Sequence, residues 1–277
     1  MDPAHAATIK ACCAAAYGSG VAQLLLGGRL HPGGPELTRR LADLLRIGPG
    51  DRVLDVASGL GTTAGLLAAE RGATVLGVDL SRRLVEAARS EALRSGLSER
   101  TRFAIGDAER LPARDAWFDV VLCECALCTF PDQGTAVAEF RRVLRPGGRL
   151  GIADVTVDRR RLPPELGTSL AWVLCLAGAR SASGYERLLR EGGFLRVLIE
   201  DHPEAALAIV DTVSARIDAA RDLLDHAFDV AAALRLTERI REAIRGGVIG
   251  YVLITAAARD ILAEPAVAEG RADGAPG

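Results

Sequence analysis

The sequence contains no long run of apolar residues. None of its stretches reaches the roughly 18 consecutive apolar residues that a membrane-spanning helix requires, and the N-terminus has no basic segment followed by a continuous apolar one. A membrane partner and a secretory route are therefore not expected. We predict a cytoplasmic protein.

An excess of charge of one sign is also missing. The 34 Lys and Arg residues nearly balance the 36 Asp and Glu residues, which leaves a formal net charge of -2. The arginines are interleaved with acidic residues, so the chain has no overall attraction to a phosphate backbone and a nucleic-acid partner is not expected. Apolar residues make up 49% of the chain, which excludes a disordered protein and allows a large buried core.

Short apolar segments alternate with helical patterns through the first part of the chain. Ser81 and Gly96, for example, predict the start and the end of one helix. The strands are predicted over residues 51–57, 74–80, 101–107, 118–124 and 148–155, and the helices over 36–46, 62–72, 81–96 and 134–145. This alternation predicts a doubly wound α/β fold, in which helices cover both faces of a mostly parallel sheet.

The remainder of the chain adds two strands and further helices. A helix near 185–191 precedes apolar segments at 194–200 and 250–258, which would complete a seven-stranded sheet. We divide the chain into five segments. These are an N-terminal helical or lid segment (1–35), a core (36–202), a helical insertion (203–248), a final core strand (249–260) and a loose tail (261–277). The apolar periodicity of the insertion is typical both of a lid and of a subunit interface. The sequence therefore does not decide whether the protein is a homodimer.

The first predicted strand leads into a glycine turn. Asp55 and Ala57 are followed by a Ser-Gly-Leu-Gly turn at residues 58–61, and its glycines let the backbone approach a ligand at the N-terminus of the next helix. In open parallel sheets, ligands bind beyond the carboxyl ends of the strands, so a nucleotide site is predicted to start here. Such glycines also close tight turns that bind nothing, and the motif alone does not decide the function.

Two aspartates extend this predicted site. Asp79 ends the second predicted strand, where an acidic side chain can accept hydrogen bonds from both ribose hydroxyls of a nucleotide. Asp107 follows the third strand beside Ala108 and could accept a hydrogen bond from an adenine amino group. An aspartate that only caps a turn is the alternative for Asp107.

Taken together, these segments resemble the class I S-adenosylmethionine (SAM) dependent methyltransferases. The similar segments are VLDVASGLGTTA, VDLS, GDAERLP, FDVVLCECAL and RVLRPGGRL, which stand in the family's order within residues 30 to 260. The resemblance implies a Rossmann-like fold, SAM as the cofactor and enzymatic methyl transfer. It also implies a cofactor site made of Asp55, Ala57, Ser58, Gly59, Gly61, Asp79, Leu80, Asp107, Ala108 and Glu124.

The resemblance also divides this site among the parts of SAM. It places Asp79 on the ribose and Asp107 with Ala108 at the adenine, while Asp55 and the two turn glycines surround the methionine part. One departure concerns Ala57 and Ser58, where the family usually has glycine or cysteine. A dehydrogenase with the same sheet is the alternative, but its G-x-G-x-x-G pattern is absent from this turn.

Three cysteines lie close together around the end of the fourth predicted strand. Cys123, Cys125 and Cys128 have C-x-C-x-x-C spacing, but a structural zinc site usually needs four ligands, and no second C-x-x-C or His pair lies nearby. No metal site is therefore predicted. The alternative to a functional role is that these thiols are small buried apolar side chains.

A closer resemblance connects these cysteines with the arsenite methyltransferases. The similar segments are VLCECALCTFPDQ, WVLCLAGARSASGYERLLREGGF and IKACCAAAYGSG. The resemblance implies trivalent arsenic as the small-molecule acceptor, held by the thiolates of Cys125 and Cys175, with Cys12 or Cys13 as a third ligand or a disulfide-exchanging thiol. The arsenic lone pair carries no proton, so no general base would be required, and His31 is predicted to be a turn residue.

Two other functions stay open. An O-, N- or C-methyltransferase of a small organic metabolite could pack a planar acceptor against aromatic residues such as Tyr17, Phe130 and Trp172. A protein that binds SAM without turnover would transfer its methyl group to no acceptor.

Overall fold

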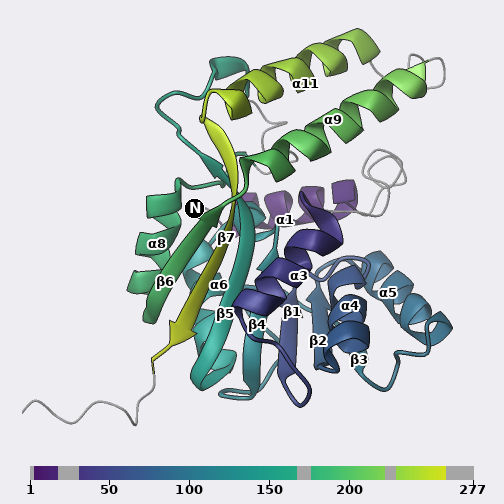
Figure 1. The fold of residues 1–277 in the computed structure, drawn as a ribbon, viewed down its shortest axis with the longest axis vertical. Coiled ribbons are helices and arrows are strands. Elements are labelled where there is room, and N and C mark those ends of the chain that lie inside the picture. The colour runs from purple at the N-terminus through teal and green to yellow at the C-terminus, as the bar shows by residue number, and fades with distance from the viewer. Residues whose placement is uncertain (1–2, 18–30, 167–175, 222–228, 260–277) are drawn as a thin grey trace, which may run out of the picture.

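A seven-stranded sheet crosses the protein, with helices on both of its faces (Figure 1). This computed structural model describes residues 3–17, 31–166, 176–221 and 229–259. The strand order is β3-β2-β1-β4-β5-β7-β6, in which β7 runs antiparallel to both β5 and β6 and the first five strands are parallel. The predicted doubly wound, mostly parallel α/β fold is confirmed.

The strands follow the predicted apolar segments. They are β1 (Arg52–Val56), β2 (Thr74–Asp79), β3 (Thr101–Ile105), β4 (Phe118–Glu124), β5 (Leu144–Val157), β6 (Phe194–Asp201) and β7 (Ile249–Ala258). β1 and β4 are buried on both faces of the sheet, which explains their nearly continuous apolar sequence. β5 begins before the predicted residue 148, because Leu144 already pairs with Phe118 and a register shift then accommodates the turn at 146–148.

One face of the sheet is covered by three helices. They are α3 (Gly34–Leu44), α4 (Thr62–Arg71) and α5 (Arg82–Arg94). Their apolar stripes, which include Leu41, Leu67 and Val85, are buried against the sheet. Ser81 caps α5 by accepting a hydrogen bond from the backbone N–H of Leu84, as the sequence predicts.

The opposite face is covered by α6 (Gln133–Val143) and α8 (Ala182–Glu191). Phe140 and Tyr185 are fully buried between these helices and the sheet. The side chains of Asp132 and Ser181 cap the two helices. Because both helices follow parallel strands, their N-termini lie at the same edge of the sheet as the carboxyl ends of β4 and β5. The 3-10 turns η1 (Leu127–Thr129) and η2 (Pro164–Leu166) lie in the loops at this edge.

The remaining helices are α1 (Pro3–Tyr17), α9 (Pro203–Ala219) and α11 (Val230–Arg245). The stretch predicted as a helical insertion thus contains α9 and α11, which pack on each other around Ile217 and Val230 and extend beyond the sheet (Figure 1). The start of α9 is fixed at His202, whose ring nitrogens lie 2.8 Å from carboxylate oxygens of Glu200 and Glu204.

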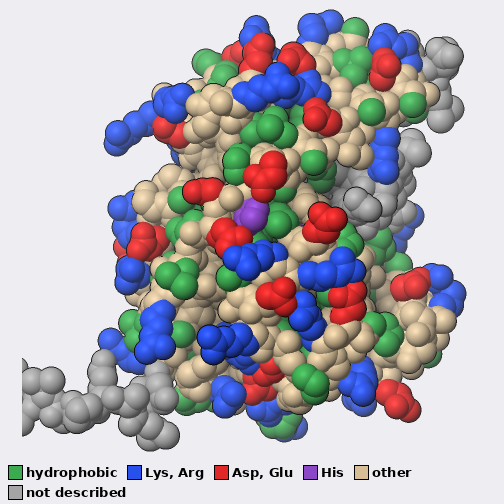
Figure 2. All heavy atoms as spheres, in the orientation of Figure 1, with side chains coloured by type: hydrophobic (Ala, Val, Ile, Leu, Met, Phe, Trp, Pro, Cys, Tyr) green, Lys and Arg blue, Asp and Glu red, His purple; other side chains and the backbone are tan. Residues whose placement is uncertain are grey.

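The surface mixes charges of both signs. Figure 2 shows acidic and basic side chains interspersed over one face, without a large area of either sign. Within the described ranges, no helix is both long and apolar enough to cross a bilayer. In open α/β sheets, ligands bind beyond the carboxyl ends of the strands, so a functional site is expected at the edge where the parallel strands end.

Candidate functional site

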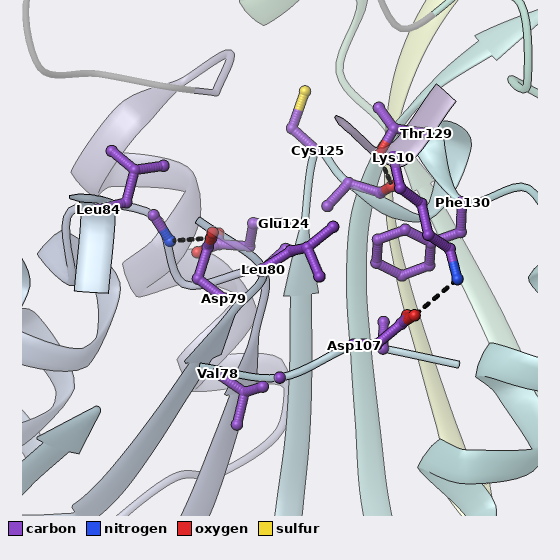
Figure 3. A pocket seen from close by; sticks show the side chains of 15 residues that line it. Lys10, Val78, Asp79, Leu80, Leu84, Asp107, Glu124, Cys125, Thr129 and Phe130 are labelled. Carbon is purple, nitrogen blue, oxygen red and sulfur yellow. Dashed lines mark hydrogen bonds and ion pairs between the residues drawn. The ribbon is translucent and has the colours of Figure 1, made fainter. Parts of the chain in front are cut away.

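The loops after β1, β2, β3 and β4 surround a hollow of about 130 Å³, which we call the main hollow (Figure 3). Its wall contains seven of the ten predicted cofactor residues: Ala57, Gly59, Asp79, Leu80, Asp107, Ala108 and Glu124. A second hollow of about 70 Å³ shares Ala57, Gly59 and Glu124 with the first, and we call it the glycine-turn hollow. Asp55 and Ser58 line this second hollow, so nine predicted residues lie at one edge of the sheet.

The tenth residue, Gly61, shapes the turn from behind. Its backbone N–H donates to the carbonyl oxygen of Ser58 at 2.8 Å, and its φ of 75° is in the left-handed region. A Cβ at this position would lie 2.6 Å from Cζ of Phe103, so a side chain has no room here. Ala57 also has a positive φ, 60°, which gives a physical reason for glycine being common at this position in the family that the sequence resembles.

Asp79 is held by the backbone of the turns around it. Its carboxylate accepts hydrogen bonds from Gly59 N at 2.9 Å and from Ser81 N at 2.8 Å. Burial raises the pKa of Asp79, while the two N–H donors act in the opposite direction. Since the backbone fixes the side chain, its remaining lone pairs are preorganised toward the main hollow, whose wall it forms.

Asp55 and Ser58 place unsatisfied polar atoms beside the turn. Asp55 is 2% exposed, and burial raises its pKa well above the ordinary value, with further contributions from the charges of Glu124 and Asp79. Among the described residues, Asp55 Oδ2 and Ser58 Oγ have no hydrogen-bond partner. Buried polar atoms are normally paired, so this hollow suits a ligand that supplies hydrogen-bond donors.

Glu124 stands between the two hollows at the end of β4. Thr63 Oγ1 donates to one of its carboxylate oxygens at 2.5 Å, and Thr38 Oγ1 lies 3.1 Å from the other. Thr38 belongs to α3 and Thr63 to α4, so two helices orient this carboxylate. His31 lines the same glycine-turn hollow, and its Nδ1 lies 3.1 Å from the carbonyl oxygen of Pro32 in the turn before α3.

Lys10 is a site residue that the sequence reasoning missed. Its Nζ donates to Asp107 Oδ2 at 2.7 Å and to Glu109 Oε2 at 2.5 Å, which brings α1 to the wall of the main hollow (Figure 3). The two carboxylates raise the pKa of Lys10 despite the opposing effect of burial. A signal was present, because Lys10 is the sole lysine of a chain whose other cations are arginines.

The predicted cysteines do not gather in the described part of the site. Cys125 lines the main hollow and projects from the end of β4 with a φ of 51° (Figure 3). Cys128 is buried and Cys12 is exposed on α1. Burial raises the pKa of the Cys123 thiol well above its usual range. Two further side chains, those of Cys13 and Tyr17, lie outside the described part of the structure, as do the whole of Trp172 and Cys175.

The fold and this edge define a class of protein. A doubly wound sheet carries a glycine turn after β1, a carboxylate at the end of β2 and a second carboxylate after β3, which is the arrangement of a nucleotide-cofactor enzyme. Comparison with known proteins narrows this class. Residues 54–152 match a family model described as a methyltransferase domain.

Relatives among characterised proteins extend over more of the chain. The 27-O-demethylrifamycin SV methyltransferase of Amycolatopsis mediterranei is 31% identical over 229 residues, 79% of this chain and 82% of that protein. Methyltransferase GfsG of Streptomyces halstedii is 37% identical over 59% of this chain and 60% of its own length. The arsenite methyltransferase of Halobacterium salinarum is 33% identical over 63% of this chain, a match that spans 44% of that protein.

The chain belongs to the SAM-dependent methyltransferases. A solved structure agrees with this fold: phosphoethanolamine N-methyltransferase 2 of Haemonchus contortus superposes with a TM-score of 0.73 at 19% identity, covering 86% of this chain and 56% of that one. The predicted enzyme class and cofactor are thus confirmed. When bound, SAM supplies an electrophilic methyl group on a sulfonium, which a nucleophile displaces directly.

The residues at this edge fit that cofactor. The carboxylates of Asp79 and Asp107 line the main hollow, as acceptors for hydroxyl and amino donors should. The unpaired oxygens of Asp55 and Ser58 suit a cationic or hydrogen-bonding group beside the glycine turn. Apolar side chains such as Leu80, Leu84 and Val78 supply the remaining wall for a ring.

Proposed function

We propose that this enzyme transfers the methyl group of SAM to a small organic metabolite, with an oxygen as the favoured acceptor atom. The observation that supports this most is the similarity over 79% of the chain to a methyltransferase whose name specifies an oxygen of an organic molecule, 27-O-demethylrifamycin SV. The names of two further relatives, cnsE of Penicillium expansum and a protein of Pyrenophora dematioidea, also specify O-methyltransferases. A cytoplasmic location and a homodimer remain predictions from the sequence.

The donor side of the proposal assigns roles to the carboxylates. Asp79 accepts hydrogen bonds from the ribose hydroxyls, and Asp107 accepts one from the adenine amino group. Asp55 faces the methionine amino group, whose positive charge would relieve the repulsion among Asp55, Asp79 and Glu124. The glycine turn lets the backbone lie against the same part of the ligand.

The acceptor side of the proposal lies around Glu124, Cys125 and Phe130. These residues line the main hollow at and after the end of β4. Glu124 is oriented by Thr38 and Thr63, so its carboxylate is available at a fixed position to hold or accept a hydroxyl proton of the acceptor. Phe130 offers a ring face against which an organic acceptor can pack.

A metalloid acceptor is the second candidate. It is supported by the 33% identity to an arsenite methyltransferase and by the position of Cys125 in the wall of the main hollow. Soft trivalent arsenic would need several thiolates. Cys125 is the single thiol that lines the main hollow in the described part of the chain.

One assay separates the two candidates. Purified enzyme is incubated with SAM that carries an isotopically labelled methyl group, either with a panel of hydroxylated organic compounds or with arsenite and a thiol reductant. Mass spectrometry then detects the labelled product. An organic product that persists in Cys125→Ser supports the proposal, whereas labelled arsenic that disappears in Cys125→Ser and Cys175→Ser replaces it with the second candidate.

The controls make a negative result informative. Asp79→Ala, which removes the proposed ribose ligand, should abolish product from either panel. Binding of S-adenosylhomocysteine (SAH) to the wild-type protein is measured in parallel by calorimetry. If SAH binds but neither panel yields a labelled product, the organic acceptor class as proposed here is wrong.

A further inference from the structure

A third hollow lies on the other side of Phe130 and has a different chemistry. It measures about 890 Å³, and we call it the arginine hollow, because Arg159, Arg160, Arg180 and Arg187 line it. Phe130 belongs to both this hollow and the main hollow, so the two are neighbours along the carboxyl edge of the sheet. Its volume is in the range that small-molecule pockets occupy in proteins.

Arginines outnumber acids among the described residues that line this hollow, four to two. None of the four arginines forms an ion pair there, whereas Arg39, Arg142 and Arg149 elsewhere each pair with a carboxylate. The two acids that line the hollow keep their charge, but they accept hydrogen bonds from backbone and hydroxyl donors rather than from the guanidinium groups of these arginines. Asp132 caps α6 by accepting from Thr135, and Asp158 Oδ1 accepts from the backbone N–H of Arg160 at 3.1 Å.

Arg180 is built into the wall. The carbonyl oxygen of Arg180 accepts a hydrogen bond from Val157 N at 3.0 Å, which ties its backbone to the end of β5. The Nε atom of Arg180 donates to Oε1 of the buried Gln133, and the amide nitrogen of Gln133 donates to the carbonyl oxygen of Gly178 at 2.8 Å. The guanidinium is therefore held in place by one nitrogen, while its two terminal nitrogens have no acceptor in the described part of the chain. Such a fixed fork suits carboxylate or phosphate oxygens.

The segment that carries Arg180 has little freedom to move away. A Cβ at Gly178 would lie 1.8 Å from the carbonyl oxygen of Cys128, so the two backbones are in direct contact. Arg159 donates to the carbonyl oxygens of Ala177 and Ala179 from the other side. In addition, the N-terminus of α8 lies at the same hollow, which Ser181, Ser183 and Gly184 line, and its first turn contains no acid.

We propose that the arginine hollow binds an anionic group, a phosphate or a carboxylate, of the methyl acceptor. This inference rests on the proposed function and refines it: the acceptor is a small organic anion that places its nucleophile near Glu124 and its charge beyond Phe130. A long polyanion is disfavoured, because the protein as a whole carries a net charge of -2 and basic and acidic side chains are interspersed over the face that Figure 2 shows.

Anion binding can be tested without knowing the acceptor. The full chain is titrated by calorimetry at low ionic strength with inorganic phosphate, pyrophosphate and citrate. Arg160→Gln/Arg187→Gln removes two exposed charges that have no partner in the described residues, and Arg102→Gln/Arg245→Gln removes the same charge outside the hollow. We expect binding of at least one anion, weakened at least about tenfold in the first double variant and unchanged in the second. The preferred probe distinguishes a phosphate from a carboxylate.

Two results would overturn the assignment. One is the absence of measurable binding of all three anions to the wild-type protein, and the other is equal weakening in both double variants. With an acceptor identified by the labelled-methyl assay, Arg160→Gln/Arg187→Gln should raise its KM about tenfold with little change in kcat. An unchanged KM contradicts the inference but leaves the proposed function intact, because SAH binding and product formation are measured separately.

Discussion

The two halves of the ligand-binding edge differ in charge, size and construction. The half around β1, β2 and β3 is narrow and acidic, and its key side chain, Asp79, is fixed by the backbone N–H groups of Ser81, 2 positions away, and of Gly59, 20 positions away. The half beyond β4 and β5 is wide and basic, and Arg180 is fixed there by Gln133, a residue far away in the chain. We assign the first half to the cofactor, and we propose the second for the anionic group of the acceptor.

The largest expected effect concerns the acidic half. Asp79→Ala removes a fixed carboxylate that we assign to both ribose hydroxyls, so SAH affinity measured by calorimetry should fall by about 100-fold or more, since hydrogen bonds to a charged group contribute about 1.5–3 kcal/mol each. Asp115→Ala, which removes an exposed acid that pairs with Arg142, serves as the control. If the two variants bind SAH equally well, Asp79 does not bind the cofactor, and the assignment of the acidic half to SAM loses its main support.

The fold was accessible from the sequence, because its signals are local. Alternating apolar and helical segments predicted the strands and the sheet class, and Ser81 with Gly96 marked the ends of α5. The start of β5 was missed, since the pairing of Leu144 with Phe118 depends on a register shift that no local pattern reveals. The division of the insertion into two helices also depends on packing, around Ile217 and Val230.

The candidate site was accessible to different degrees in its two halves. Nine predicted residues line the two acidic hollows, because each lies at or shortly after the end of a strand and the strands of a parallel sheet end at one edge. Lys10 was missed, since the contact with Asp107 joins residues 97 positions apart. The arginine hollow was missed for the same reason, because Arg180 and Arg160 are unremarkable in a chain with many arginines until the fold brings them together.

The second prediction tests the rigidity of the basic half. Gly178→Ala would force a methyl group against the carbonyl oxygen of Cys128, so the free energy of unfolding in urea should decrease by about 2 kcal/mol through overpacking. Gly193→Ala is the comparison: its Cβ has open space but its φ of +83° is strained for alanine, so a smaller cost of about 1 kcal/mol is expected. Equal costs would indicate that the segment before Arg180 can move aside.

The third prediction uses Asp55 to separate stability from binding. The pKa of Asp55 is raised by burial and by its acidic neighbours, so the folded state holds the proton more tightly than the unfolded chain. Stability is therefore lost as pH rises from the ordinary aspartate pKa toward the raised one. Asp55→Asn should increase the free energy of unfolding at neutral pH, and this gain should shrink as pH falls to the ordinary aspartate range.

The same variant should bind the cofactor less well. Asn lacks the charge that we assign to the methionine amino group, so SAH affinity should fall by about tenfold although the protein is more stable. Calorimetry with SAH and urea unfolding at several pH values measure the two effects independently. A variant that gains both stability and affinity would show that the unpaired oxygen of Asp55 serves no ligand.

The smallest expected effect concerns Lys10, which joins α1 to the acidic half. In Lys10→Met the wall of the main hollow loses two partly exposed ion pairs, so SAH affinity should fall by about threefold, in keeping with the modest contribution of such pairs. Lys10→Arg keeps the charge and should retain most of the affinity.

Because Lys10 is the sole lysine, an amine-reactive reagent followed by mass spectrometry reports its exposure directly. SAH should slow this labelling, because the ligand would fill the hollow that Lys10 lines. Faster labelling with SAH would mean instead that the cofactor takes Asp107 from Lys10 and releases α1.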